Sequence, residues 1–118
     1  MTPRSPAAAG KGTAAPAVAG TTLPPMSEKA WQTRVLDYAR FKGWRAIHHP
    51  DSRRVTEAGL PDLLLVRPPR VVFAELKSTS GVIRPAQIAM LAKLKLCPGV
   101  ETCLWRPADW PAVMETLA

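Results

Sequence analysis

The sequence predicts an α/β fold in which a central mixed β-sheet is flanked by helices. Segments whose apolar residues recur at helical spacing are interspersed with short apolar runs of strand length. Two of these runs flank Pro68-Pro69, which indicates a hairpin. The elements follow in the order α-β-β-β-α-β-α without an internal repeat, and 118 residues suffice for one domain with one modest core.

Residues 1–25 are expected to form a flexible tail in front of a single domain at 26–118. The segment is rich in Ala, Pro, Gly and Thr, and it contains no acidic and almost no large apolar residue. Such a composition cannot bury enough surface to offset the entropy of ordering. The tail also lacks the apolar core of a signal peptide, and no apolar run in the chain reaches the roughly 18 residues of a membrane span. We therefore expect a cytoplasmic protein.

A first helix is predicted at 28–42. Ser27 is a suitable N-cap for it, and Gly43 ends it. The stripe that this helix would bury has helical spacing and consists of Trp31, Val35, Tyr38 and Ala39. A short strand at 44–48 and a polar loop at 49–59 follow.

Five further elements complete the prediction, namely strands at 60–67, 70–77 and 100–106 and helices at 85–96 and 109–117. Pro85 suits the first turn of its helix, whereas Arg84 stands where a small polar residue is the usual cap. The stripe of this helix that would lean toward the sheet consists of Gln87, Met90, Leu91 and Leu94.

Charge and cysteine content narrow the classes of partner. The 16 Lys and Arg residues outnumber 9 Asp and Glu residues, which gives a net charge of +7 and suits a polyanionic partner. Cys97 and Cys103 are too few for a four-thiolate zinc site, and we expect both to be ordinary buried thiols in a reducing compartment. The four tryptophans are expected in the core or at an interface.

The hairpin register predicts an unusual pair of acids. If the strands pair symmetrically about Pro68-Pro69, Leu64 faces Phe73 and Asp62 falls directly opposite Glu75. Side chains alternate with period two, so Lys77 shares the face of Glu75. Directly opposed residues have Cβ atoms roughly 5 Å apart.

Two carboxylates this close repel each other, and each resists ionisation beside the other. A hard divalent cation with oxygen ligands would compensate, and Asp62, Glu75, a backbone carbonyl and water could form an open site for it. The alternative is structural: Asp62 closes a turn after Pro61, while Glu75 and Lys77 pair at a sheet edge.

Pro61-Asp62, the 13-residue step to Glu75 and the triplet Glu75-Leu76-Lys77 resemble the PD-(D/E)XK nuclease signature. More narrowly, the chain resembles the small stand-alone form of the virus-type replication-repair nuclease (VRR-NUC) family. The resemblance covers about residues 27–110, in the order SEKAWQTRVLDYARFKGW, GLPDLLLV, VVFAELKS, the glutamine that opens the next helix, and VETCLWRPADW.

This resemblance implies a restriction-endonuclease-like core and cleavage of DNA phosphodiester bonds with Mg²⁺ or Mn²⁺. By position, Asp62 and Glu75 would be metal ligands, with the Leu76 carbonyl as a third. Lys77 would orient or polarise the attacking water and stabilise the transition state. A cytoplasmic enzyme of a bacterial or phage-infected cell, with a role in DNA repair, fits the same family.

Two further residues match family positions and have a structural alternative each. Glu28 matches an acidic residue of the first helix that reaches the metal directly or through water, although it could merely favour the helix dipole. Gln87 matches a glutamine that positions a phosphate or bonds near Lys77, although it could instead cap its own helix.

Candidate DNA contacts lie around the polar loop and the second helix. Arg53 and Arg54 are plausible phosphate clamps, and His48 and Arg84 could contact the substrate as well. For loop charges, solvation without a partner is the alternative. No segment resembles a base-reading helix, so we expect little sequence specificity.

The predicted function is that of a DNA endonuclease, with branched, flapped or nicked DNA as possible substrates by family analogy alone. A homodimer would be a natural route to two cuts. A non-catalytic nucleic-acid-binding module and a metal-independent RNA endonuclease of related fold are the alternatives. The paired acids and Lys77 argue against both.

Overall fold

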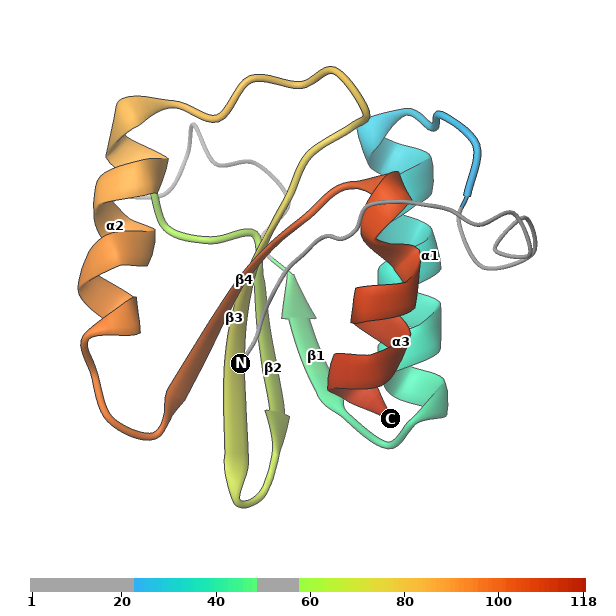
Figure 1. Cartoon of the computed structure of the whole chain (residues 1–118). Coiled ribbons are helices and arrows are strands. Elements are labelled where there is room, and N and C mark those ends of the chain that lie inside the picture. The colour runs from blue at the N-terminus through green and yellow to red at the C-terminus, as the bar shows by residue number, and fades with distance from the viewer. Residues whose placement is uncertain (1–22, 49–57) are drawn as a thin grey trace.

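The computed structural model describes residues 23–48 and 58–118, so the expected tail at 1–22 and the loop residues 49–57 lie outside the described part. The elements are α1 (Glu28–Phe41), β1 (Arg45–His48), β2 (Leu63–Arg67), β3 (Arg70–Leu76), α2 (Pro85–Lys95), β4 (Val100–Trp105), the 3-10 turn η3 (Pro107–Asp109) and α3 (Trp110–Leu117). The predicted order is confirmed, and η3 is added directly before the last helix (Figure 1).

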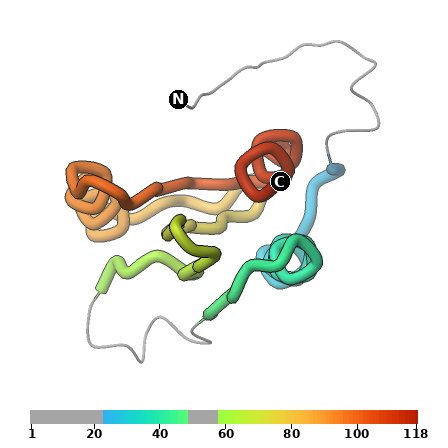
Figure 2. The backbone as a smooth tube through the Cα atoms, turned by 90° about the horizontal axis from the view of Figure 1, so that it is seen from below, coloured from blue at the N-terminus to red at the C-terminus, as the bar shows by residue number. Residues whose placement is uncertain are grey.

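The four strands form one sheet in the order β1-β2-β3-β4. The pairs β1–β2 and β2–β3 are antiparallel, whereas β3 and β4 are parallel, so the sheet is mixed as predicted. The parallel pair requires a crossover, which α2 provides. Helices α1 and α3 lie on one side of the sheet and α2 lies on the other (Figures 1 and 2).

The hydrophobic core lies between the sheet and the helices α1 and α3. Alternate residues of β2 and β3 point into it, because side chains of a strand alternate between its two faces. The fully buried members are Trp31, Val35, Ala39, Leu63, Leu65, Val72, Ala74, Leu76, Val113 and Leu117. All four tryptophans are buried, as predicted. Tyr38 is half-buried at the margin of the core, where its hydroxyl donates to the Met114 carbonyl at 3.4 Å.

The ends of α1 follow the capping signals in the sequence. The Ser27 Oγ accepts a hydrogen bond from the Ala30 N–H at 3.1 Å. At the other end, Gly43 has a φ of 86°, a left-handed conformation that favours glycine. These local interactions explain why the predicted bounds of this helix agree with the structure.

Strand β2 begins at Leu63, three residues later than predicted. Pro61 has no N–H to donate to a ladder. The side chain of Asp62 takes the place of a further ladder bond, since its Oδ2 accepts from the Leu76 N–H at 2.9 Å. Asp62 therefore joins the start of β2 to the end of β3 through its side chain.

Both cysteines are free, and the prediction of buried thiols holds in part for Cys103, which is half-buried. Cys103 packs against the core, and burial raises the pKa of its thiol to about 12. Cys97 is exposed after α2, so the prediction was wrong for this residue. In the described residues no helix combines the length and apolarity needed to cross a membrane.

Candidate metal centre

The predicted hairpin register is observed. Leu64 pairs with Phe73, Val66 with Val71 and Arg67 with Arg70, and the pairing continues outward to Leu63 opposite Ala74. The next step brings Asp62 beside Glu75 at the open end of the hairpin. Both acids lie close enough for the charge of Asp62 to act on the Glu75 carboxyl. The acid pair of the sequence analysis is therefore present.

Glu75 is the centre of this group, although only 1% of its surface is exposed. Its Oε2 accepts a hydrogen bond from the Gln87 Nε2 at 2.7 Å and lies 3.5 Å from the Lys77 Nζ. Its Oε1 is buried and has no hydrogen-bond partner among the described residues. A buried oxygen without a hydrogen-bond partner lowers the stability of the folded protein. A cation or donor that binds to this oxygen does not have to remove water from it first.

The surroundings raise the pKa of Glu75 from 4.5 to about 8. Burial is the largest cause, because it penalises the charged form, and the negative charge of Asp62 acts in the same direction. The ammonium of Lys77 opposes both effects but does not cancel them. In the absence of a further positive charge, this raised pKa favours the protonated form of Glu75.

The donor set suits a hard divalent cation. Carboxylate oxygens of Asp62 and Glu75 are the ligands such ions prefer, and the unpartnered Oε1 offers a free coordination position. Among the described residues, no three His, Cys, Asp or Glu side chains gather closely enough to hold a metal ion. Within the described part of the chain, a cation here would find two carboxylate ligands, and backbone carbonyl and water could complete its shell.

Gln87 caps its helix and also bonds a side chain of the candidate site, whereas its contact with a phosphate stays a prediction. Its Nε2 donates to Glu75, and its Oε1 accepts from the Arg84 N–H at 2.8 Å. It therefore caps the first turn of α2 and orients the buried acid with the two ends of one amide.

Gly59 allows the loop before Asp62 to approach this helix. Its φ is 89°, and a Cβ at this position would lie 2.3 Å from the carbonyl oxygen of Ala86. No other residue type fits so close to the backbone of α2. Gly59 thus packs the segment that carries Asp62 directly against the turn that carries Gln87.

The backbone of Lys77 is fixed by the neighbouring strand. Its N–H donates to the Trp105 carbonyl at 3.1 Å, and the same oxygen accepts from the Trp31 indole at 2.9 Å. Its side chain is 9% exposed. Trp105 and the adjacent Arg106 are neighbours of the site that were not predicted from the sequence, although the stretch VETCLWRPADW contains both.

The remaining predicted residues lie at various distances from the acid pair. His48 ends β1 and pairs with Leu63, so it lies at the same end of the sheet as Asp62. Arg84 is exposed at the start of α2. Glu28 is exposed on the first turn of α1 and is not grouped with the two acids in the described residues, so its role as a ligand stays a prediction. Arg53 and Arg54 lie outside the described residues.

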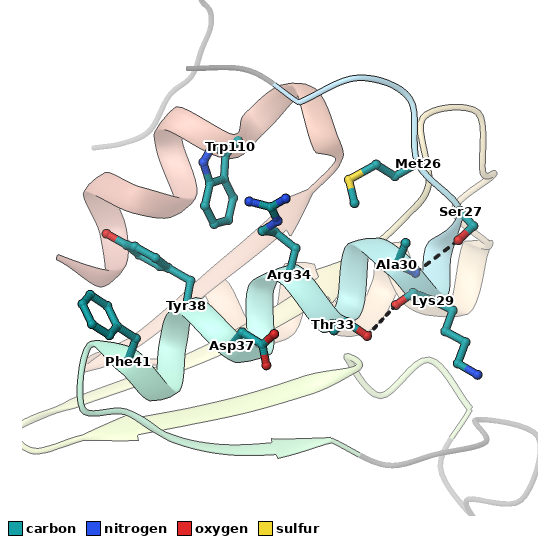
Figure 3. A pocket seen from close by; sticks show the side chains of 10 residues that line it. All are labelled: Met26, Ser27, Lys29, Ala30, Thr33, Arg34, Asp37, Tyr38, Phe41 and Trp110. Carbon is teal, nitrogen blue, oxygen red and sulfur yellow. Dashed lines mark hydrogen bonds between the residues drawn. The ribbon is translucent and has the colours of Figure 1, made fainter. Parts of the chain in front are cut away.

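A second feature of the surface is an open groove of about 890 Å³ beside α1 and Trp110 (Figure 3). Met26, Tyr38 and Phe41 contribute apolar walls, and the Arg34 guanidinium lies 5.6 Å from the centroid of the Trp110 ring. None of the predicted site residues lines this groove. It is therefore separate from the candidate metal centre.

No protein-family model and no curated protein matches the sequence. Solved structures similar to the chain include the following two. One is described as a VRR_NUC domain protein. The match covers 80% of this chain and 93% of that protein's chain, with 21% identity and a TM-score of 0.57. The other is described as a VRR_NUC domain. The match covers 76% of this chain and 96% of that domain's chain, with 17% identity and a TM-score of 0.61. The chain therefore has the fold of VRR_NUC domains, which confirms the predicted resemblance and the predicted fold class.

Proposed function

We propose that the chain is a divalent-metal-dependent nuclease that hydrolyses phosphodiester bonds of DNA. The observation that carries this proposal is the buried Glu75 carboxylate, which keeps one oxygen without a partner next to the second acid, Asp62. The fold shared with two VRR_NUC domains supports the same function. The net charge of +7 supports a polyanionic substrate.

Mg²⁺ or Mn²⁺ would be held by Asp62, Glu75 and the Leu76 carbonyl. When bound, such a cation activates water and stabilises charge on a phosphate. Gln87 donates to the Oε2 of Glu75 and thereby leaves Oε1 available. Asp62 is restrained by the Leu76 N–H, so the two acids are oriented before any ligand arrives.

Lys77 would act in the chemistry itself. It is buried, which strengthens the electrostatic effect of its ammonium on nearby groups. From its place beside Glu75 it would orient the attacking water or stabilise negative charge on the phosphate. Arg84, His48, Arg53 and Arg54 would contact phosphates further along the DNA.

A substrate panel tests the reaction class. Single-stranded, duplex, flapped and four-way DNA are incubated with the protein and Mg²⁺, Mn²⁺ or EDTA. We expect cleavage with either metal, preferably of flapped or branched DNA, and no cleavage in EDTA. Cleavage of RNA in EDTA would instead indicate a metal-independent RNA endonuclease. Binding of DNA without cleavage would indicate a non-catalytic nucleic-acid-binding module. Sedimentation of the same sample measures whether two copies associate. A homodimer would provide one site for each of the two DNA strands.

Replacement of Lys77 by alanine tests the central residue. Loss of one preorganised charge typically costs on the order of 10²–10³ in rate. Single-turnover cleavage should fall by that amount, whereas DNA affinity in Ca²⁺ should stay close to that of the wild type. Lys77→Arg should rescue poorly, because a planar guanidinium does not replace a compact ammonium. Near-normal cleavage by Lys77→Ala would show that this lysine is only a charge at the sheet edge.

A further inference from the structure

Arg106 follows β4 directly and connects the sheet to the turn after Lys77. Its Nη1 donates to the backbone carbonyls of Ser78 at 2.8 Å and Gly81 at 2.7 Å. The Gly81 N–H also donates to the Ser78 carbonyl at 3.3 Å. One guanidinium nitrogen therefore fixes both ends of the turn 78–81.

The backbone of Arg106 is itself restrained. Its N–H donates to the Asp109 Oδ2 at 2.8 Å, at the start of η3. The residue before it, Trp105, accepts the Lys77 N–H at 3.1 Å. Trp105 thus holds the N–H of Lys77, and Arg106 holds the carbonyl of the residue after Lys77, Ser78.

The turn also lies against the side chain of Lys77. A Cβ added to Gly81 would lie 3.6 Å from the Lys77 Cδ, so the backbone of the turn borders the stem of the lysine. The ammonium at the other end of that stem lies 3.5 Å from the Oε2 of Glu75. Movement of the turn would therefore displace the ammonium relative to the acid pair.

We propose that Arg106 is a positioning residue of the nuclease site: it holds the turn 78–81 so that the Lys77 ammonium stays beside Glu75. The inference rests on the proposed nuclease function. Arg106 acts through backbone carbonyls, and its effect on the reaction passes through Lys77.

Single-turnover cleavage of DNA in Mn²⁺ at saturating enzyme tests this role in Arg106→Ala and Arg106→Lys. A misplacement of about 1 Å can cost on the order of 10² in rate, and we expect a loss of that size for Arg106→Ala. The melting temperature falls somewhat, but DNA affinity in Ca²⁺ is retained. Arg106→Lys recovers part of the rate, because an ammonium can donate to two carbonyls.

Arg67 provides a matched control at the opposite end of the sheet. Its Nη1 also donates to two backbone carbonyls, those of Lys42 at 2.9 Å and Leu117 at 3.4 Å. Arg67 also donates to the Ala118 carbonyl at 2.8 Å and lies 4.5 Å from the centroid of the Trp44 ring. Arg67→Ala should therefore lower the melting temperature at least as much, and still cleave at the wild-type rate well below that temperature. Equal rate losses in Arg67→Ala and Arg106→Ala would overturn the inference, since they would report loss of stability alone.

A double substitution isolates the route of the effect. If Arg106 acts through Lys77, Arg106→Ala costs no further rate once Lys77→Ala is present. An undiminished loss in that background overturns the inference, because Arg106 would then act on the substrate directly. If Arg106→Ala does not fold, the same comparison is made with Arg106→Lys. A wild-type protein that cleaves nothing refutes the nuclease function itself, whereas an active one that is indifferent to Arg106 refutes only this inference.

Discussion

Glu75 combines features that conflict within one residue: it is acidic, buried and close to a second acid. A buried carboxylate normally finds partners for both oxygens, yet Gln87 and Lys77 approach only Oε2. The sequence predicted the encounter of Asp62 with Glu75, because the period of a strand and a symmetric turn determine register. It could not predict Gly59 or Arg106, because their contacts join segments that are far apart in the chain.

The raised pKa of Glu75 predicts how a cation affects stability at different pH. Its folded pKa of about 8 exceeds the ordinary 4.5, so the folded state without metal holds a proton that the unfolded state releases. Stability without metal therefore falls as pH rises from about 4.5 to about 8. A cation must displace this proton, so the stabilisation that it gives should grow over the same range.

Melting temperatures with Ca²⁺ and with EDTA between about pH 6 and about pH 9 measure this effect. Glu75→Gln should abolish the metal-induced shift at every pH, because the amide cannot ionise. Glu101→Gln is the control, since Glu101 pairs with Arg70 at the other end of the sheet. A metal-induced shift that does not vary with pH would contradict the proton displacement.

At the scale of elements, the site lies where the ends of several strands pack against the start of α2. The ends of β1, β3 and β4 and the start of β2 lie together, because β1 and β3 run opposite to β2 while β3 and β4 are parallel. The sequence predicted these elements from periodicity and capping. Pro61 is a local signal for where β2 begins, but the bond from the Leu76 N–H to Asp62 is tertiary, and local patterns do not predict it.

Gly59→Ala should disrupt the contact between the Asp62 loop and α2. Gly99→Ala is a matched control, because Gly99 has a similar φ of 81° but no atom within 4 Å of an added Cβ. Backbone strain alone should cost Gly99→Ala about 1–2 kcal/mol of unfolding free energy. Gly59→Ala should cost more than about 3 kcal/mol, since the Ala86 backbone cannot move away as a side chain would. Equal losses in urea unfolding would show that the close approach contributes nothing.

At the scale of the whole molecule, the net charge of +7 predicts binding to DNA that weakens steeply with salt. Each phosphate contact contributes about 0.9 to the slope of log affinity against log salt for duplex DNA. Arg84→Ala should reduce the slope by about one such contact, because this exposed residue stands at the start of α2 near the acid pair.

Arg34→Ala is the corresponding control for that measurement. Arg34 lies in the groove beside Trp110, which contains none of the predicted site residues (Figure 3). Its replacement should leave the slope unchanged if DNA binds at the acid pair. An equal reduction by both substitutions would mean that the charge attracts DNA without a defined docking face.

Helix α2 is attached to the body of the protein in an uncommon way. Among its residues, all of which the structure describes, Gln87 is the one that is buried, and Ile88 is 52% exposed. The buried side chain of this helix is thus the one that bonds Glu75, whereas Met90, Leu91 and Leu94 are half-buried. We therefore expect undocking of α2 to release Glu75 from the amide that orients it, in a local opening that costs less free energy than global unfolding. A ligand bound at the acid pair should therefore slow amide hydrogen exchange along α2. By reciprocity, an interaction that holds α2 in place should increase the affinity of the acid pair for that ligand.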